Sequence, residues 1–243
     1  MKRVLVVGAT SGIGRALSER LAEKGVELFL IGRNKALLSE LVCKLNGDKH
    51  DYFCADLSFE NSLDKFVIDR SFDGVAYCAG QESLLPLRAI SYKRFSSIMN
   101  LHVFNFLNII KSISKFKGRG DKDPCSIVGM SSYAARNGGK TQTLYSSSKA
   151  AMEAVVRPLS IELLEQNIRI NTISPGLVNT EMTRRWAESI KLSEGELTSR
   201  QWMGMADVND VVNLIYFLLS DNSKHIAGTN VDINGIGPVT LLD

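Results

Sequence analysis

The sequence predicts an α/β fold in which helices cover both faces of one parallel, doubly wound sheet. Short runs rich in Val, Ile and Leu alternate along the chain with longer segments of helical spacing. A glycine-rich turn joins the first apolar run to the first helical segment, and no linker, repeat or low-complexity tract interrupts the pattern. Strands buried on both faces form continuous apolar runs, and their alternation with helices is typical of a parallel sheet.

Each predicted strand is a short apolar run, often β-branched, that ends at a glycine or a polar turn. In chain order, the predicted strands are residues 2–7, 26–31, 50–54, 73–78, 126–130, 168–173 and 229–233. Each predicted helix repeats apolar side chains every three or four residues, with charged residues between them. In chain order, the predicted helices are residues 13–24, 35–45, 61–69, 92–116, 145–166 and 207–220.

Composition restricts the classes of function. Hydrophobic residues make up 44% of the chain, and the net charge of +3 is too small to favour nucleic acid or a membrane surface as a partner. The basic run at residues 111–122 is explained as a helix C-terminus whose cations complement the helix dipole. The four cysteines have no metal-binding or C-x-x-C spacing, so we expect no metal site. A reducing, cytoplasmic location without a signal peptide is expected.

One stretch, residues 181–206, breaks the regular alternation. It follows the sixth predicted strand and contains Trp186, Trp202 and three methionines. A long insertion after the carboxyl end of a strand is typical of a lid, and its apolar content disfavours a disordered surface loop. We therefore expect residues 181–206 to cover a substrate.

The glycine-rich turn has the pattern of a dinucleotide site. Gly8, Gly12 and Gly14 form G-x-x-x-G-x-G between the first strand and the first helix. Such glycines allow a tight turn, close approach of the backbone to a pyrophosphate, and close packing of helix on strand. The N–H groups at the helix N-terminus then face the phosphates. A purely structural turn is the alternative, and the strand–turn–helix context disfavours it.

The residues after the second strand indicate which dinucleotide binds. An NAD site places a carboxylate about twenty residues after the glycines, where it bonds the ribose 2′-hydroxyl. This chain has Arg33 and Lys35 there instead. A guanidinium fork suits a 2′-phosphate, so we expect NADP rather than NAD, with Arg33 as the discriminating residue. A solvent-exposed loop charge is the alternative for Arg33.

A second motif indicates acid–base chemistry. Tyr145 and Lys149 stand four residues apart, which places them on one helix face, and Ser132 lies at a strand end thirteen residues before Tyr145. An ammonium beside a phenol favours the phenolate, so we expect Lys149 to lower the pKa of Tyr145 from about 10. Ser132 could hydrogen-bond the same substrate oxygen. Taken alone, the tyrosine–lysine spacing also fits an ordinary surface helix.

Together, the glycine turn, Ser132 and Tyr145-x-x-x-Lys149 resemble the short-chain dehydrogenases/reductases, over essentially the whole chain. The resemblance implies one NAD(P)-binding Rossmann domain, residues 1–243, with strand order 3-2-1-4-5-6-7. It implies that Tyr145 exchanges a proton with the substrate oxygen, Ser132 polarises the carbonyl, and Lys149 lowers the tyrosine pKa and bonds the nicotinamide ribose. Asn100 is implied to hold a water that links Lys149 to solvent.

The resemblance also implies a set of cofactor contacts. They are Gly8, Ser11, Gly12, Ile13, Gly14, Arg33, Asp56, Leu57, Ala79, Gly80, Tyr145, Lys149, Pro175, Val178 and Thr180. The family implies homodimers or homotetramers that form through the helices at 92–116 and 145–166. Cys78 departs from the family's usual Asn-Ala-Gly, and a thiol cannot supply the hydrogen bonds of an amide. His102, a lone histidine on a predicted helix, is expected to be structural.

The expected function is NADP-dependent hydride transfer between nicotinamide and a carbonyl or secondary alcohol of a small molecule. The substrate stays open among 3-oxoacyl thioesters, sugar-derived compounds, polyols and hydrophobic ketones. Gln166 stands where reductases of acyl-carrier-protein substrates tend to have an arginine, which argues against that substrate. A catalytically silent NADP-binding regulator of the same fold is the alternative, and the intact Ser132, Tyr145 and Lys149 count against it.

Overall fold

The computed structural model describes residues 1–118, 123–189, 191–199 and 201–236. Over these residues it contains a sheet of seven parallel strands in the order β3-β2-β1-β4-β5-β6-β7. The strands are β1 Arg3–Val7, β2 Glu27–Gly32, β3 Asp51–Cys54, β4 Gly74–Tyr77, β5 Cys125–Met130, β6 Ile168–Pro175 and β7 Asn230–Ile233. The predicted fold class and strand order are therefore confirmed.

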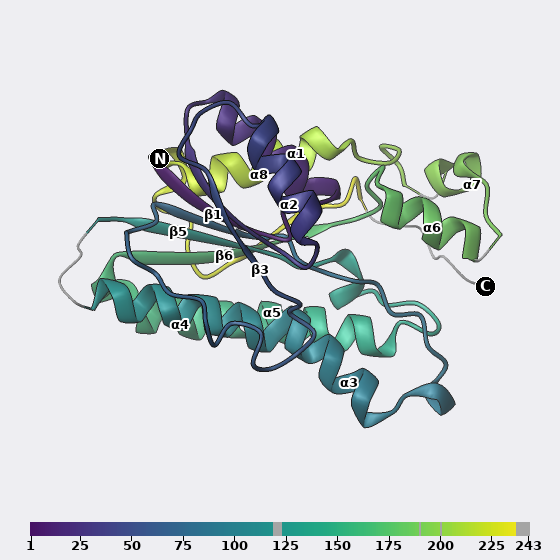
Figure 1. Cartoon of the computed structure of the whole chain (residues 1–243). Coiled ribbons are helices and arrows are strands. Elements are labelled where there is room, and N and C mark those ends of the chain that lie inside the picture. Colours follow the sequence, from purple (N-terminus) through teal and green to yellow (C-terminus); the bar gives the residue numbers. More distant parts are fainter. Residues whose placement is uncertain (119–122, 190, 200, 237–243) are drawn as a thin grey trace.

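Helices cover both faces of the sheet (Figure 1). On one face lie α1 Gly12–Glu23, α2 Lys35–Lys44 and α8 Val208–Leu219, and on the other lie α4 Asn105–Lys117 and α5 Thr143–Glu162. The alternation of side chains in β1 explains this arrangement, because neighbouring residues of a strand point to opposite faces. Val4 and Val6 pack in the cluster that contains the α1 and α8 side chains, whereas Leu5 and Val7 pack with α4 and α5. All of β1 is buried, which explains its continuous apolar run.

Shorter helices connect these layers. They are α3 Tyr92–Met99, α6 Glu181–Ser189, α7 Glu194–Ser199, and the 3-10 turns η1 Leu87–Ala89, η3 Tyr133–Ala135, η4 Leu164–Gln166 and η5 Asp221–Ser223. The stretch predicted as a lid thus contains two helices, and Figure 1 shows both beyond the carboxyl ends of the strands. An isolated β-bridge between Val178 and Ala206 closes the base of this stretch.

The predicted long helix at 92–116 is interrupted by a π-helical segment, η2 Asn100–Phe104. The backbone N–H of Asn105 donates to the Asn100 carbonyl, five residues back. The wider turn brings Asn100 and Asn105 to the same side of the helix. Their side-chain amides donate to backbone carbonyls of residues 57–59 at 2.9–3.1 Å. The interruption therefore lets one helix hold the loop after β3 at two points.

The predicted helix at residues 61–69 is wrong, because the structure has turns there. These turns close through short-range hydrogen bonds, such as that from the Phe66 N–H to the Leu63 carbonyl at 2.9 Å. Phe66 packs between Phe29 and Phe53, with ring centroids 5.8 and 5.7 Å away. Burial of this aromatic ring against β2 and β3 outweighs the weak local helical pattern. The crossover from β3 to β4 accordingly lacks a helix.

This packing predicts a large difference between two phenylalanines of the same crossover. Phe66→Ala should lower the free energy of unfolding by about 3 kcal/mol, the usual cost of truncating a buried aromatic side chain. Phe66 is 8% exposed, whereas Phe59 is 62% exposed. Phe59→Ala should therefore cost less than about 1 kcal/mol. Urea unfolding followed by circular dichroism measures both variants, and equal losses would contradict the aromatic anchoring of this crossover.

Candidate functional site

A cavity of about 860 Å³ opens at the carboxyl ends of the strands. It lies at the large end of the range for small-molecule sites, roughly 300–1,000 Å³. Its lining includes these residues predicted from the sequence: Gly8, Ser11, Gly12, Ile13, Gly14, Arg33, Asp56, Leu57, Ala79, Gly80, Ser132, Tyr145, Lys149, Pro175, Val178 and Thr180. The fold thus brings together residues that lie more than 170 positions apart in the chain.

The three glycines of the turn have different physical roles. A Cβ at Gly8 would lie 2.6 Å from the Ala79 nitrogen, and one at Gly14 would lie 2.2 Å from the Gly8 oxygen. Both positions therefore need glycine for close packing of the chain itself. A Cβ at Gly12 would meet nothing nearer than 4.0 Å, at Thr180. Gly12 borders open space instead, and its missing side chain leaves room there for a phosphate group.

The N-terminus of α1 fits an anion. Ser11 is the N-cap residue, and its hydroxyl makes no side-chain capping hydrogen bond to the helix. The first turn of this twelve-residue helix contains no acidic side chain. The first N–H groups of a helix lack intrahelical partners and lie at its positive end. Together with the space at Gly12, they form a cradle for a pyrophosphate.

Arg33, Asp56 and Leu57 line the far end of the same cavity. Arg33 follows the last residue of β2 and is exposed. Asp56 accepts a hydrogen bond from the Ser58 N–H at 3.0 Å, which holds the turn after β3. Leu57 is buried, and its carbonyl accepts the Asn105 amide. This end of the cavity therefore offers the exposed Arg33 guanidinium and an apolar wall at Leu57. Both suit the adenosine part of a dinucleotide.

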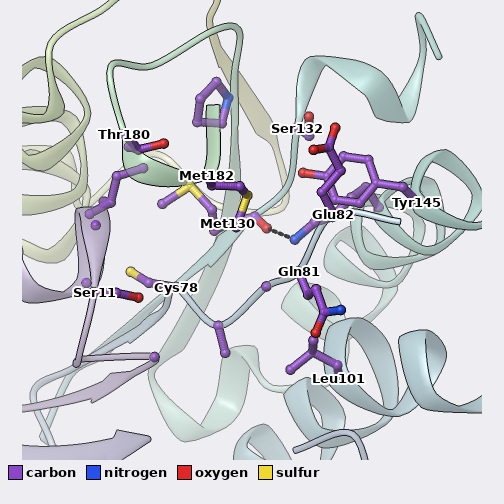
Figure 2. Close-up of a pocket in the computed structure, with 18 of the residues that line it drawn as sticks. Ser11, Cys78, Gln81, Glu82, Leu101, Met130, Ser132, Tyr145, Thr180 and Met182 are labelled. Carbon is purple, nitrogen blue, oxygen red and sulfur yellow. Dashed lines mark hydrogen bonds between the residues drawn. The ribbon is translucent and has the colours of Figure 1, made fainter. Parts of the chain in front are cut away.

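Ser132, Tyr145 and Lys149 meet at the other end of the cavity (Figure 2). Ser132 follows β5 and accepts the Ala134 N–H at 3.2 Å, and its hydroxyl is near enough to that of Tyr145 to lower the pKa of the phenol. Lys149 is buried, and its ammonium lies 5.8 Å from the centroid of the Tyr145 ring. The Lys149 Nζ donates to the Met130 carbonyl at 2.7 Å, the dashed line in Figure 2.

The prediction that Lys149 lowers the pKa of Tyr145 is wrong for this structure. Burial raises the pKa of Tyr145 to about 12, although the hydrogen bond from Ser132 lowers it, and the Glu82 charge raises it further. Burial also lowers the pKa of Lys149 to about 7. A lysine that is half neutral at pH 7 provides little charge to favour a phenolate. The Tyr145 hydroxyl is thus fully protonated at neutral pH.

Asn100 is the predicted site residue that lies elsewhere. Within the described residues, the cavity lining includes its neighbour Leu101 but not Asn100. The Asn100 side chain donates to the Ser58 carbonyl at 3.1 Å, and its own carbonyl accepts the Asn105 N–H. Its observed contacts are structural, and the water relay stays a prediction.

His102 is structural, as its isolation in the sequence suggests, but it acts next to the site. It is fully buried, and its Nε2 accepts the Gln81 N–H at 3.1 Å. Its Nδ1 lies 2.8 Å from the Ser148 hydroxyl, which donates to the Tyr145 carbonyl. Since Nε2 accepts, the proton is on Nδ1. His102 therefore ties the loop after β4 to the first turn of α5.

Glu153 is a residue that the motif search missed. One of its carboxylate oxygens accepts the hydroxyl groups of Ser131 at 2.7 Å and Ser174 at 2.6 Å. Its other oxygen lies 3.6 Å from Arg136. Glu153 follows Lys149 by one helical turn, so these bonds pin the face of α5 that carries Tyr145 and Lys149 to the ends of β5 and β6. The i, i+4, i+8 spacing from Tyr145 was the available signal.

Cys78 occupies the position where the family usually has asparagine. Its backbone N–H donates to the Val7 carbonyl at 2.8 Å, and its side chain lies against Gly14 and lines the cavity. Burial raises the pKa of the Cys78 thiol to about 12, so it stays neutral. The site therefore keeps its strand geometry with a small apolar group at this place.

Over the described residues, no helix is both long enough and apolar enough to cross a membrane. Among the same residues, no cluster of three or more His, Cys, Asp or Glu side chains is placed to hold a metal ion.

Comparison with known proteins identifies the family. Residues 8–235 match the family model described as "Enoyl-(Acyl carrier protein) reductase". L-xylulose reductase of Caenorhabditis elegans is 32% identical over 240 residues, which cover 96% of this chain and 94% of that protein. (3R)-3-hydroxyacyl-CoA dehydrogenase of Rattus norvegicus is 31% identical, covering 95% of this chain and 94% of that protein.

A solved structure, 4-hydroxyisoleucine dehydrogenase complexed with NADH, superposes with a TM-score of 0.86 at 25% identity and covers 97% of this chain and 98% of that one. The fold of this chain agrees with that match. The chain therefore belongs to the short-chain dehydrogenase/reductase family of oxidoreductases.

Proposed function

We propose that this protein is an NADPH-dependent reductase that converts a small-molecule ketone into a secondary alcohol. The observation that carries the proposal is the grouping of Ser132, Tyr145 and Lys149 in a cavity that also includes the glycine turn. Relatives named as reductases and dehydrogenases support the reaction class. Their names suggest two substrate classes, L-xylulose and a (3R)-3-hydroxyacyl-CoA thioester.

The side chains have distinct tasks in this reaction. A nicotinamide bound between the glycine turn and Thr180 would supply the hydride for the carbonyl carbon. Ser132 and Tyr145 bond the carbonyl oxygen, where negative charge develops. Tyr145 then delivers its proton to that oxygen. The Tyr145 phenol is protonated at neutral pH, so it can act as the acid in this step.

Arg33 supports NADPH over NADH. Its exposed guanidinium lies at the cavity edge, after β2, where a ribose 2′-phosphate would reach it. The similar solved structure holds NADH, so the preference proposed for this chain rests on Arg33 itself.

We also propose that α6 and α7 form a substrate lid over a single dinucleotide-binding domain. Met182 and Trp186 of α6 line the same cavity as Tyr145 and contribute apolar surface to it. We propose an oligomer that forms through the helices at 92–117 and 143–162, because Phe104 of η2 and Ile161 of α5 expose 44% and 66% of their surface.

The first prediction concerns the cofactor. Arg33→Ala should weaken NADPH binding roughly 10- to 100-fold, the effect of losing a charged hydrogen-bonded pair, and should leave NADH binding nearly unchanged. Fluorescence titration with both cofactors measures the change. Lys35→Ala removes the same charge two residues later, outside the lining of the described cavity, and serves as the control. Equal affinity of the parent protein for NADPH and NADH would contradict the assignment.

The second prediction is a pattern of three slow variants. Tyr145→Phe should lower kcat about 10²–10⁴-fold, the usual contribution of a positioned acid, without changing NADPH affinity. Ser132→Ala should also lower kcat while the cofactor still binds. Lys149→Ala should lower both kcat and NADPH affinity, because the Lys149 ammonium lies beside Tyr145 and is also expected to bond the nicotinamide ribose. Near-parent turnover by Tyr145→Phe would refute tyrosine-dependent reduction, and an inactive parent that still binds NADPH would favour a silent regulator.

The third prediction concerns the folding stability that is lost because the Lys149 ammonium is buried. Its pKa of about 7 in the folded protein lies below the usual 10.5, so the folded state binds its proton less tightly than the unfolded state. The resulting loss of stability is complete below pH 7 and fades as the pH rises from 7 towards 10. Lys149→Met should stabilise the cofactor-free protein at pH 7 by on the order of 2 kcal/mol.

Urea unfolding of the parent and of Lys149→Met at pH 7 and pH 9.5 tests this pH dependence. The increase in the free energy of unfolding caused by Lys149→Met should be smaller at pH 9.5. Lys140→Met changes an exposed lysine in the same way and should show no such dependence. A gain from Lys149→Met that is equal at both values of pH would show that its charge is not the cause.

A further inference from the structure

Glu82 lies on the loop after β4, two residues beyond Gly80, and lines the cavity, although no motif of the sequence assigned this residue. Hydrogen bonds hold the loop on both sides of this residue. The Gln81 N–H donates to the buried His102 Nε2 at 3.1 Å, and the Leu85 N–H donates to the Thr141 carbonyl at 2.8 Å. The backbone that presents Glu82 is therefore fixed relative to α5, as a recognition residue requires.

The Glu82 side chain is also held. Gln142 lines the same cavity and lies near enough to lower the pKa of the Glu82 carboxyl. The amide NH₂ of Gln142 is the group that can donate to an ionised carboxyl, because a carboxylate only accepts. A carboxylate offers about four acceptor positions, so one such bond leaves acceptor capacity for a ligand in the cavity.

The carboxyl lies close to the reacting centre. Its charge acts on the Tyr145 hydroxyl, and Figure 2 shows Glu82 beside Tyr145 and Ser132. Met182 and Trp186 line the same cavity with apolar surface. A substrate whose carbonyl oxygen reaches Ser132 and Tyr145 therefore has its neighbouring carbon atoms next to Glu82.

Half-burial of Glu82 has a chemical consequence. It raises the pKa of the Glu82 carboxyl to about 7, although the bond from Gln142 lowers it. A substrate without a hydrogen-bond donor would cover this carboxyl and leave it unpaired, which costs free energy. A hydroxyl group can donate to the ionised carboxyl or accept from the protonated one. An anionic group would meet repulsion from the ionised form.

We propose that Glu82 selects ketones with a hydroxyl group on the carbon next to the carbonyl, so that the substrate class is hydroxylated ketones and not 3-oxoacyl thioesters. The assignment rests on the proposed reductase function and specifies the substrate for that same site. It follows from the position of a held carboxyl beside the groups that bond the carbonyl oxygen.

The test uses two ketones that differ by one hydroxyl, 1-hydroxybutan-2-one and butan-2-one, with a short 3-oxoacyl thioester as a third probe. NADPH oxidation gives kcat/KM for each probe with the intact protein. The parent should prefer the hydroxyketone over butan-2-one by roughly 10-fold or more, the effect of one hydrogen bond to a charged group. It should also prefer the hydroxyketone over the thioester.

Variants of Glu82 test whether its carboxyl causes the preference for the hydroxyketone over butan-2-one. Glu82→Leu should lower kcat/KM for the hydroxyketone roughly 10- to 100-fold and leave that for butan-2-one unchanged or raised. Glu82→Gln keeps an acceptor without the charge and should retain part of the preference. Glu23→Gln removes one charge at an exposed position on α1 and should leave all rates as in the parent. NADPH titration shows that each variant is folded.

The outcomes distinguish a failure of the Glu82 assignment from a failure of the proposed reductase function. An equal preference in the parent and in both Glu82 variants would overturn the role of Glu82 and leave the reductase function standing. A parent that prefers the thioester would overturn the substrate class. A parent that reduces none of the probes faster than Tyr145→Phe would overturn the inference together with the function on which it rests.

Discussion

The geometry of the site depends on one close contact between two backbone segments. At Gly8 the end of β1 lies so near the residues after β4 that a Cβ would come within 2.6 Å of the Ala79 nitrogen. The chain proceeds from β1 to β2 on one side, while β4 pairs with β1 on the other. Ligand sites of open parallel sheets lie where the strand order reverses in this way. The contact at Gly8 therefore sets the width of the crevice in which the glycine turn, Cys78 and Lys149 meet.

Helix α5 is the second constraint, because it carries Tyr145 and Lys149, two of the three side chains proposed to be catalytic. It is fixed on both sides of the face that carries them. His102 ties its first turn to the loop after β4 through Ser148. Glu153 ties its third turn to the hydroxyl groups of Ser131 and Ser174. Buried hydrogen bonds of this kind specify one arrangement, since each partner would be left unsatisfied in another. The positions of the Tyr145 hydroxyl and the Lys149 ammonium follow from these anchors.

Much of this organisation was predictable from the sequence, because the relevant signals are local. The apolar run of β1 and the spacing of Tyr145 and Lys149 each belong to a short stretch, and the order of the stretches indicates the family. The predictions that were wrong concern features that depend on contacts between residues far apart in the chain. The turns around Phe66 replace a predicted helix because its ring fills a gap between β2 and β3. The direction of the Tyr145 pKa shift depends on burial, which spacing does not reveal. Glu82 has no motif, and its place is visible only in the folded chain.

The interrupted helix has a consequence for how the molecule opens. The backbone carbonyls of residues 57–59 accept their hydrogen bonds from the Asn100 and Asn105 side chains, and not from a helix of their own. This loop therefore cannot separate from η2 and α4 without breaking all three of these bonds. The wall around Leu57 and the helix pair α3–α4 therefore form one cooperative unit of local unfolding. A ligand held by that wall would slow amide exchange along both helices, far from any atom that it contacts.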